Sequence, residues 1–194
     1  MLKQAWVVLS CVAFLGLAST AIAAVHYYDG QSYTVGGTAG ADIYLGTTIN
    51  DYLTLDDYLV NTFGTHLNLN AGGSIQYSLV LHNQATVTMT GGSVGYNIHA
   101  EEDTTVTMSG GLVGLSFVAQ HNAVIYLEGS NFSVTASGVT TALGNVDNVS
   151  SYATLIEDGN SDYYFGTITG TLADGTTLDN TFYIYNTGPY YGGT

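Results

Sequence analysis

The amino-acid sequence predicts an all-β protein, built as a single-stranded parallel β-helix of about 19 residues per coil with a C-terminal β cap. Three observations lead to this prediction. The decamer TVTMTGGSVG at residues 86–95 returns as TVTMSGGLVG at residues 105–114. Apolar residues alternate within each unit, which is the period of a strand and not of a helix. Glycine pairs interrupt the alternation at fixed places, where each coil needs a corner.

Residues 1–23 have the features of an export signal. Lys3 precedes an apolar run at residues 6–17, and small residues follow up to Ala23. The run is too short to span a bilayer, so we expect cleavage after Ala23 or the next residue, and a secreted protein with no transmembrane segment. Lipidation at Cys11 is the alternative, although cleavage before Cys11 would leave only a short apolar segment in the signal.

The composition excludes several classes of partner. The chain has fifteen Asp and Glu residues and a formal net charge of −14 at pH 7. Its one basic side chain, Lys3, and its one cysteine, Cys11, both lie in the expected signal. Without Lys or Arg the mature chain cannot replace the counterions of nucleic acid or of anionic membranes, so we expect neither as a partner. Without Cys it forms no disulfide, so a single domain must rely on its own core.

A period of nineteen residues runs through the middle of the chain. The segment LNLNAGGSI at residues 67–75 joins the pattern when Ala71 is treated as an insertion. Stacked coils would place equivalent residues in ladders along one axis, about 4.8 Å apart. The positions expected to face inward form these ladders: Val87, Val106 and Ile125; Met89, Met108 and Leu127; Gly91, Gly110 and Gly129; Val94, Val113 and Phe132; Tyr96, Leu115 and Val134; Ile98 and Phe117; Ala100 and Ala119.

The period also divides the chain. Residues 64–136 are expected to form the regular coils, and residues 24–63 an N-terminal cap with degenerate coils. Residues 137–194 are expected to form a loop and closing strands around a hairpin turn at residues 173–175, because an open end would expose unpaired backbone. A two-sheet sandwich also has many short strands, but it gives no reason for a fixed period.

The repeated decamer, together with GTITGTLADGTTLDNTFYIYN at residues 166–186, resembles exported bacterial β-helix proteins with pectin-lyase-like or autotransporter-passenger-like repeats. The resemblance covers residues 64–134 and the end segment. It implies the β-helix fold and export. Because the chain ends at GPYYGGT without a sorting tail or membrane barrel, the resemblance further implies secretion or non-covalent attachment to a surface.

Glu101, Glu102 and Asp103 form a polar turn that we expect to bind calcium. The equivalent turns of the neighbouring units read HNQ at residues 82–84 and QHN at residues 120–122. Oxygen-rich side chains on adjacent coils suit Ca²⁺ better than Zn²⁺, which prefers nitrogen and sulfur ligands. A solvated acidic corner that opposes sideways aggregation is the alternative.

Few residues point to catalysis, and we predict that the protein is not an enzyme. Asp56–Asp57 and Glu157–Asp158 are acidic pairs that could serve glycoside hydrolysis if a groove brought them together. The resemblance to β-helix polysaccharide lyases implies a cationic base, which the mature chain lacks. We expect structural roles for the histidines in the repeat region: His66, His82, His99 and His121.

Tyrosine is the outlier of the composition, with sixteen residues. Tyr27 and Tyr28 lie near one end of the mature chain, and Tyr190 and Tyr191 near the other. We expect these doublets to contact a second copy, other surface proteins or polysaccharide. Head-to-tail contact between unlike ends would give filaments. Tyrosine is also simply a good strand former on a half-buried face, which is the alternative.

These features predict a secreted structural or adhesive β-helix protein of a bacterial surface or extracellular matrix, able to form fibres. Calcium is the only cofactor expected. The alternative function is a glycan-binding or glycan-hydrolysing β-helix module that uses acidic and Tyr residues.

Overall fold

The computed structural model describes residues 25–37, 42–56, 64–143, 154–156 and 163–185. All regular structure within these ranges is β-strand, so the prediction of an all-β protein is confirmed. Within the same ranges we find no helix long and apolar enough to cross a membrane. The expected export signal lies outside the described residues.

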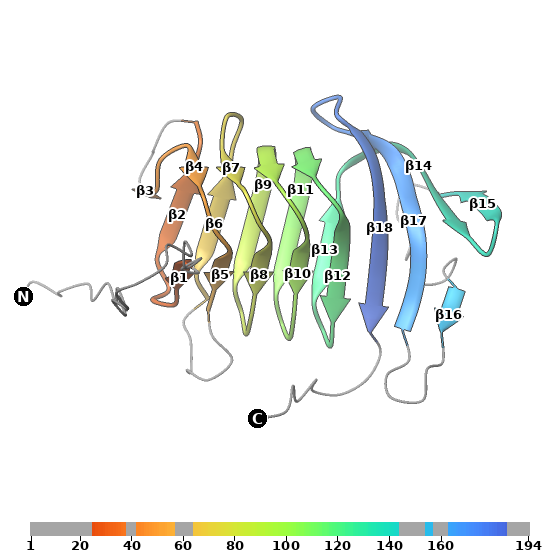
Figure 1. Ribbon diagram of the computed structural model, residues 1–194, viewed down its shortest axis with the longest axis horizontal. Helices are drawn as coiled ribbons and strands as arrows, with labels where there is room; N and C mark the ends of the chain where they lie inside the picture. Colours follow the sequence, from red (N-terminus) through yellow and green to blue (C-terminus); the bar gives the residue numbers. More distant parts are fainter. Residues whose placement is uncertain (1–24, 38–41, 57–63, 144–153, 157–162, 186–194) are drawn as a thin grey trace, which may run out of the picture.

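The first of two sheets begins with parallel strands and ends with antiparallel ones (Figure 1). Its parallel strands are, in spatial order, β1 (Val25–Tyr27), β5 (Leu53–Leu55), β8 (Leu79–Leu81), β10 (Ile98–Ala100), β12 (Ser116–Gln120) and β18 (Thr177–Tyr185). Antiparallel strands follow in the order β17 (Tyr163–Leu172), β14 (Gly129–Ala136) and β15 (Val139–Ala142), and β16 (Thr154–Ile156) also pairs with β17.

The second sheet is parallel at every pairing. Its main path is β13 (Val124–Leu127), β11 (Thr105–Val113), β9 (Thr86–Val94), β6 (His66–Leu69), β2 (Ser32–Val35) and β3 (Ile43–Tyr44). Two short strands complete it, because β7 (Ser74–Ile75) pairs both with the far end of β9 and with β4 (Thr48–Ile49).

The predicted register is confirmed between β8 and β12 and between β9 and β13. Val106 pairs with Val87 on one side and with Ile125 on the other, at the expected spacing of nineteen. Leu67 pairs with Val87 at a spacing of twenty, so the extra residue is accommodated in the turn after β6. The earlier strands pair across longer spacings, since Leu53 lies beside Leu79.

The chain alternates between the sheets, so each nineteen-residue unit contributes to both. Strands β8, β10 and β12 lie in the first sheet, and β9, β11 and β13 in the second. The alternating apolar residues of both sheets meet in one buried cluster, which is why strand periodicity in the sequence becomes a core. Its fully buried large side chains include Leu53, Leu55, Leu67, Leu69, Ile75, Leu79, Leu81, Met89, Ile98 and Met108.

Glycine pairs form the corners that the repeat predicted. Gly92 has a φ of 74° and Gly111 a φ of 93°, in the left-handed region that side chains rarely occupy. Gly114 is needed for a different reason, because a Cβ there would lie 2.0 Å from the Gly95 carbonyl oxygen. At this position the two units can pack as closely as they do only because Gly114 has no side chain.

The predicted repeat ends earlier than residue 136. Parallel pairing in the second sheet stops at Leu127, and β14 pairs antiparallel with β17 instead of stacking on β11. The position equivalent to Gly92 and Gly111 is occupied by Ser130, so the glycine corner is missing where the parallel stacking ends. The predicted stacking of Gly129, Phe132 and Val134 on the preceding unit is therefore wrong, although Val134 is buried and Phe132 packs against the core as expected.

Tyr96 and Leu115 were also predicted to face inward, and they face solvent instead. Their side chains are 46% and 54% exposed. Both lie in bends between a strand of the second sheet and a strand of the first. A bend interrupts the alternation of side chains, so the period of two does not carry through it.

The predicted closing strands are present as the β17–β18 hairpin. The chain reverses at residues 173–175, where Gly175 has a φ of 90° and its N–H donates to the Leu172 carbonyl at 2.9 Å. The side chain of Asn180 is buried and donates through Nδ2 to the carbonyls of Val113, at 2.8 Å, and Leu115, at 3.2 Å. Asn180 thus supplies the donors that a further unit would have supplied from its backbone.

Thr104 provides a prediction about the core. Its side chain is 1% exposed, at the position equivalent to Ala85 and Ala123, and its hydroxyl has no hydrogen-bond partner among the described residues. Thr104→Val keeps the shape and removes the unsatisfied hydroxyl, so we expect a gain of about 1 kcal/mol in the free energy of unfolding. Urea denaturation checks this, with the half-buried Thr107→Val as the control. A loss of stability in Thr104→Val would contradict it.

Candidate functional site

The outer face of the first sheet carries side chains that project away from the core between buried residues such as Ile98 and Ala100. Parallel pairing aligns them in three columns across β8, β10, β12 and β18. The first column consists of Ser78, Asn97, Ser116 and Thr181; the second of Val80, His99, Val118 and Tyr183; the third of His82, Glu101, Gln120 and Tyr185.

Hydrogen bonds between units fix the first column. The Ser116 hydroxyl donates to Asn97 Oδ1 at 2.8 Å, and the Asn97 backbone N–H donates to the Ser78 hydroxyl at 3.3 Å. Each contact spans nineteen residues in the sequence. The repeat therefore holds short, uncharged polar side chains in place on rigid strands.

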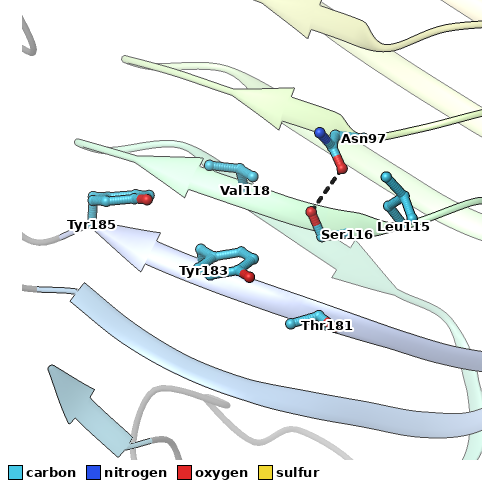
Figure 2. A pocket seen from close by; sticks show the side chains of 7 residues that line it. All are labelled: Asn97, Leu115, Ser116, Val118, Thr181, Tyr183 and Tyr185. Carbon is cyan, nitrogen blue, oxygen red and sulfur yellow. Dashed lines mark hydrogen bonds between the residues drawn. The ribbon is translucent and has the colours of Figure 1, made fainter.

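A depression with a volume of about 440 Å³ opens between β10, β12 and β18 (Figure 2). Polar side chains border it at one end, where Asn97 and Ser116 are joined by their hydrogen bond. Tyr183 and Tyr185 from β18 lie toward the other end, with Val118 between the strands. The complete lining is Asn97, Leu115, Ser116, Val118, Thr181, Tyr183 and Tyr185.

Aromatic rings continue from this depression onto β17. Tyr163 lies 5.2 Å from Tyr185 and 6.1 Å from Tyr183, measured between ring centroids. Phe165 lies 5.2 Å from Tyr183. Tilted pairs at these distances are favourable, so the rings support one another as an aromatic cluster, which we define as Tyr163, Phe165, Tyr183 and Tyr185.

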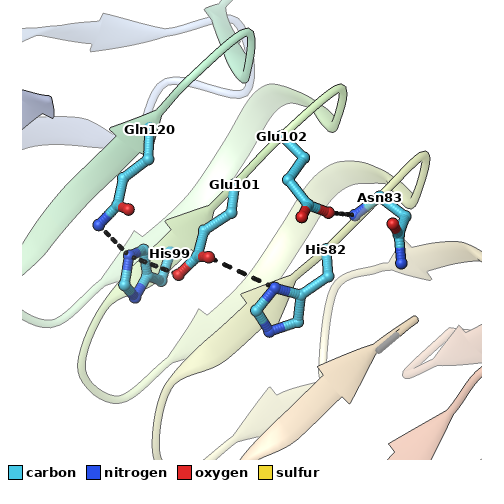
Figure 3. A network of polar contacts seen from close by, with 6 residues as sticks. All are labelled: His82, Asn83, His99, Glu101, Glu102 and Gln120. Atoms are coloured by element: carbon cyan, nitrogen blue, oxygen red, sulfur yellow. Dashed lines mark hydrogen bonds and ion pairs between the residues drawn. The ribbon is translucent and has the colours of Figure 1, made fainter. Parts of the chain in front are cut away.

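A histidine–carboxylate cluster lies where β8, β10 and β12 end (Figure 3). Glu101 lies between two histidines, with Oε1 3.2 Å from His99 Nε2 and Oε2 3.5 Å from His82 Nδ1. Gln120 Nε2 approaches His99 Nε2 at 3.0 Å. Units on both sides of Glu101 thus contribute to its environment.

The pKa values of Glu101 and His99 are both lowered in this cluster. Burial by itself would raise the pKa of the Glu101 carboxyl, but the hydrogen bond from His82 and the charges of His99, His82 and His121 outweigh it and lower that pKa. Burial lowers the pKa of His99, and this effect outweighs the opposite influence of Glu101. The cluster therefore favours an ionised Glu101 beside a neutral His99.

This arrangement predicts a pH dependence of stability. The pKa of His99 is lowered in the folded state, which means that folding favours the neutral imidazole. The resulting contribution of His99 to the free energy of unfolding is fully present above the ordinary histidine pKa of about 6.5. It is lost as the pH falls through the lowered pKa of the folded state. We expect the melting temperature of the wild type to fall more between pH 7.5 and pH 5 than that of His99→Gln. The exposed His26→Gln serves as the control. Equal falls in the wild type and His99→Gln would contradict the prediction.

The residues of the expected calcium turn do not converge on one point. Glu101 faces the histidines, Glu102 accepts from the Asn83 backbone N–H at 2.5 Å, and Asp103 Oδ1 accepts from Asn122 Nδ2 at 2.9 Å. Across the described part of the chain, no three His, Cys, Asp or Glu side chains are arranged to hold a metal ion. Calcium binding at this turn stays a prediction, and each carboxylate here has a protein partner.

The turn itself is a corner of the repeat with unusual backbone geometry. Asn83, Glu102 and His121 have φ values of 54°, 60° and 57°, at successive spacings of nineteen. Asn tolerates this region best among the three. The sequence indicated the turn but gave no sign that a glutamate would adopt a left-handed conformation there.

The acidic pairs do not form a described catalytic site. Asp56 is 1% exposed and accepts from the hydroxyl of Thr65 at 2.6 Å and from its N–H at 3.3 Å, which is the environment of a structural carboxylate. Asp57, Glu157 and Asp158 lie outside the described residues.

The terminal tyrosines are only partly described. Tyr27 is half-buried and its ring lies 4.2 Å from that of Tyr33, while Tyr28 is 41% exposed. Burial, with a smaller contribution from Asp29, raises the pKa of Tyr27. Tyr27 thus packs within its own chain. Tyr190 and Tyr191 lie outside the described residues.

Three features were not predicted from the sequence: an outward ladder of tyrosines, the first column and the depression. Tyr52, Tyr77 and Tyr96 form an outward ladder, with ring centroids 5.2 and 5.6 Å apart and the second pair tilted by 7°. Their ring faces cover one another, which suits a structural role. Asn97 and Ser116 are polar residues nineteen residues apart, and this spacing could have predicted the first column.

Comparison with models of known families, with curated protein sequences and with solved structures found no match for the chain. The resemblance to exported β-helix proteins therefore stays a prediction from sequence.

Proposed function

We propose that this chain is a secreted, non-enzymatic β-helix protein with a structural or adhesive role at a bacterial surface or in an extracellular matrix. The observation that supports it best is the parallel register at a spacing of nineteen, from Leu79 and Val87 to Phe117 and Ile125. Such stacking produces a rigid body whose length follows the number of units.

The β-helix interpretation explains why the chain alternates between two parallel sheets. One unit passes through the second sheet, turns at a glycine pair, continues along the same strand and then enters the first sheet. A sandwich would join its strands without this order. The proposed coil is thus a closed circuit of nineteen residues around the buried ladders.

The described residues support a binding or structural role more than catalysis. Of the four acidic residues considered for hydrolysis, Asp56 is buried and bonded to Thr65. The cluster of Glu101 with His82 and His99 places a carboxylate between histidines, without a second carboxylate across a groove as glycoside hydrolysis requires.

Three measurements test the proposal on purified residues 24–194. Small-angle scattering should give an elongated monomer, and co-sedimentation with isolated bacterial envelopes should retain the protein in the pellet. A reducing-sugar assay on the same material should show no release of new ends. Release of reducing ends would overturn the non-enzymatic assignment, and failure to sediment with envelopes or with itself would overturn the adhesive role.

A further inference from the structure

We propose that the depression between β10, β12 and β18 binds an uncharged glycan chain. The inference deepens the adhesive role and rests on it, because it names the chemistry that the protein would adhere to. The site has a volume of about 440 Å³, within the range of roughly 300–1,000 Å³ typical of small-molecule sites. The rings of β17 lie beside it, because Tyr163 contacts Tyr185 and Phe165 contacts Tyr183 of the lining.

The lining matches the two surfaces of a sugar. Asn97, Ser116 and Thr181 present amide and hydroxyl groups at one side, where sugar hydroxyls can exchange hydrogen bonds. Tyr183 and Tyr185 add rings whose apolar bodies can lie against sugar C–H groups while their hydroxyls stay polar. None of the seven lining side chains carries a charge at neutral pH.

Charge selects among the ligands that such a depression could hold. A phosphate, sulfate or uronate would require a cation, and Lys3 of the expected signal is the only Lys or Arg in the chain. The nearest carboxylate in the columns is Glu101, whose pKa is lowered and which would repel an acidic sugar. A neutral glycan therefore fits this face and a polyanion does not.

The site is also held rigidly before any ligand arrives. Ser116 pairs with Thr181 and Gln120 with Tyr185 across β12 and β18, so the lining lies on hydrogen-bonded strands rather than on loops. The hydrogen bond from Ser116 to Asn97 ties in a third strand. Little ordering of side chains would oppose binding, which favours affinity from a small contact area.

Isothermal titration of residues 24–194 with hexasaccharides tests the inference. The probes are neutral cellohexaose, laminarihexaose and mannohexaose, and acidic hexagalacturonate. We expect at least one neutral probe to bind with a Kd below about 1 mM. Tyr183→Ala should weaken that binding at least tenfold, and Tyr183→Phe, which keeps the ring, less than threefold.

Tyr126→Ala is the matched control, because Tyr126 is a 56% exposed tyrosine on β13 of the second sheet. Its affinity should equal that of the wild type, and circular dichroism should show both alanine variants folded. Binding of hexagalacturonate alone, binding of no neutral probe, or equal weakening by Tyr126→Ala and Tyr183→Ala would each overturn the inference. A protein that binds none of these probes yet sediments with envelopes would lose this site and keep its adhesive role.

Discussion

Met108→Asp is expected to unfold the protein or to lower its stability by about 5 kcal/mol or more. Met108 is 0% exposed and lies between Met89 and Leu127 in a core ladder. The new carboxylate would be buried without a Lys or Arg to pair with, and such burial costs several kcal/mol. That is a large share of the 5–15 kcal/mol typical of a domain. Thermal melting followed by circular dichroism measures the loss.

The adjacent residue provides the control for this prediction. Thr107 is half-buried and lies on the outer side of the same strand, beside Thr88 and Tyr126. Thr107→Asp should cost less than about 1 kcal/mol, as exposed substitutions usually do. Met108→Ala gives a measurable loss of about 2–5 kcal/mol if the aspartate variant does not fold at all. Equal losses at positions 107 and 108 would show that the inward and outward assignment is reversed or absent.

Asn180→Asp is expected to lower the free energy of unfolding by about 3 kcal/mol. The substitution keeps the size of the side chain but replaces the amide donor with carboxylate oxygens, which would face the carbonyls of Val113 and Leu115. Two acceptors lose their hydrogen bonds, and a charge is placed in a buried position. Urea denaturation at pH 7 measures the change.

The neighbouring Asp179→Asn exchanges the same two side-chain types in the opposite direction, at an exposed position of the same strand. It should change stability by less than about 0.5 kcal/mol. If Asn180→Asp were equally mild, Asn180 would not be the group that completes the last unit, and the carbonyls of Val113 and Leu115 would have to be satisfied in another way.

The sequence was most informative where one unit repeats another. Val87, Val106 and Ile125 share both their spacing and their side of the strand, so the register followed from the period alone. The period did not predict the residue at which the parallel repeat ends. The repeat ends where Ser130 replaces the corner glycine, and β14 then pairs antiparallel with β17, which the period does not predict.

The candidate site was harder to predict because it joins segments far apart in the chain. Asn97 and Ser116 belong to the repeat, but Thr181 and Tyr183 come from the closing hairpin, some sixty residues later. No periodicity links the two, and parallel pairing of β12 with β18 brings them together. The alternation of apolar and polar residues predicts which side chains face outward. It does not predict which strand lies beside β12, because that depends on how the β17–β18 hairpin packs against it.

The pairing between units has a consequence for how such a chain can grow. Val106 and Met108 of β11 meet apolar residues at the same offset on both sides, because β9 presents Val87 and Met89 and β13 presents Ile125 and Leu127. A duplicated nineteen-residue segment would therefore find complementary surfaces already present on both sides, and the closing hairpin would dock unchanged on the final copy. Tandem duplication of one unit would lengthen such a chain, and the terminating hairpin would still close its end.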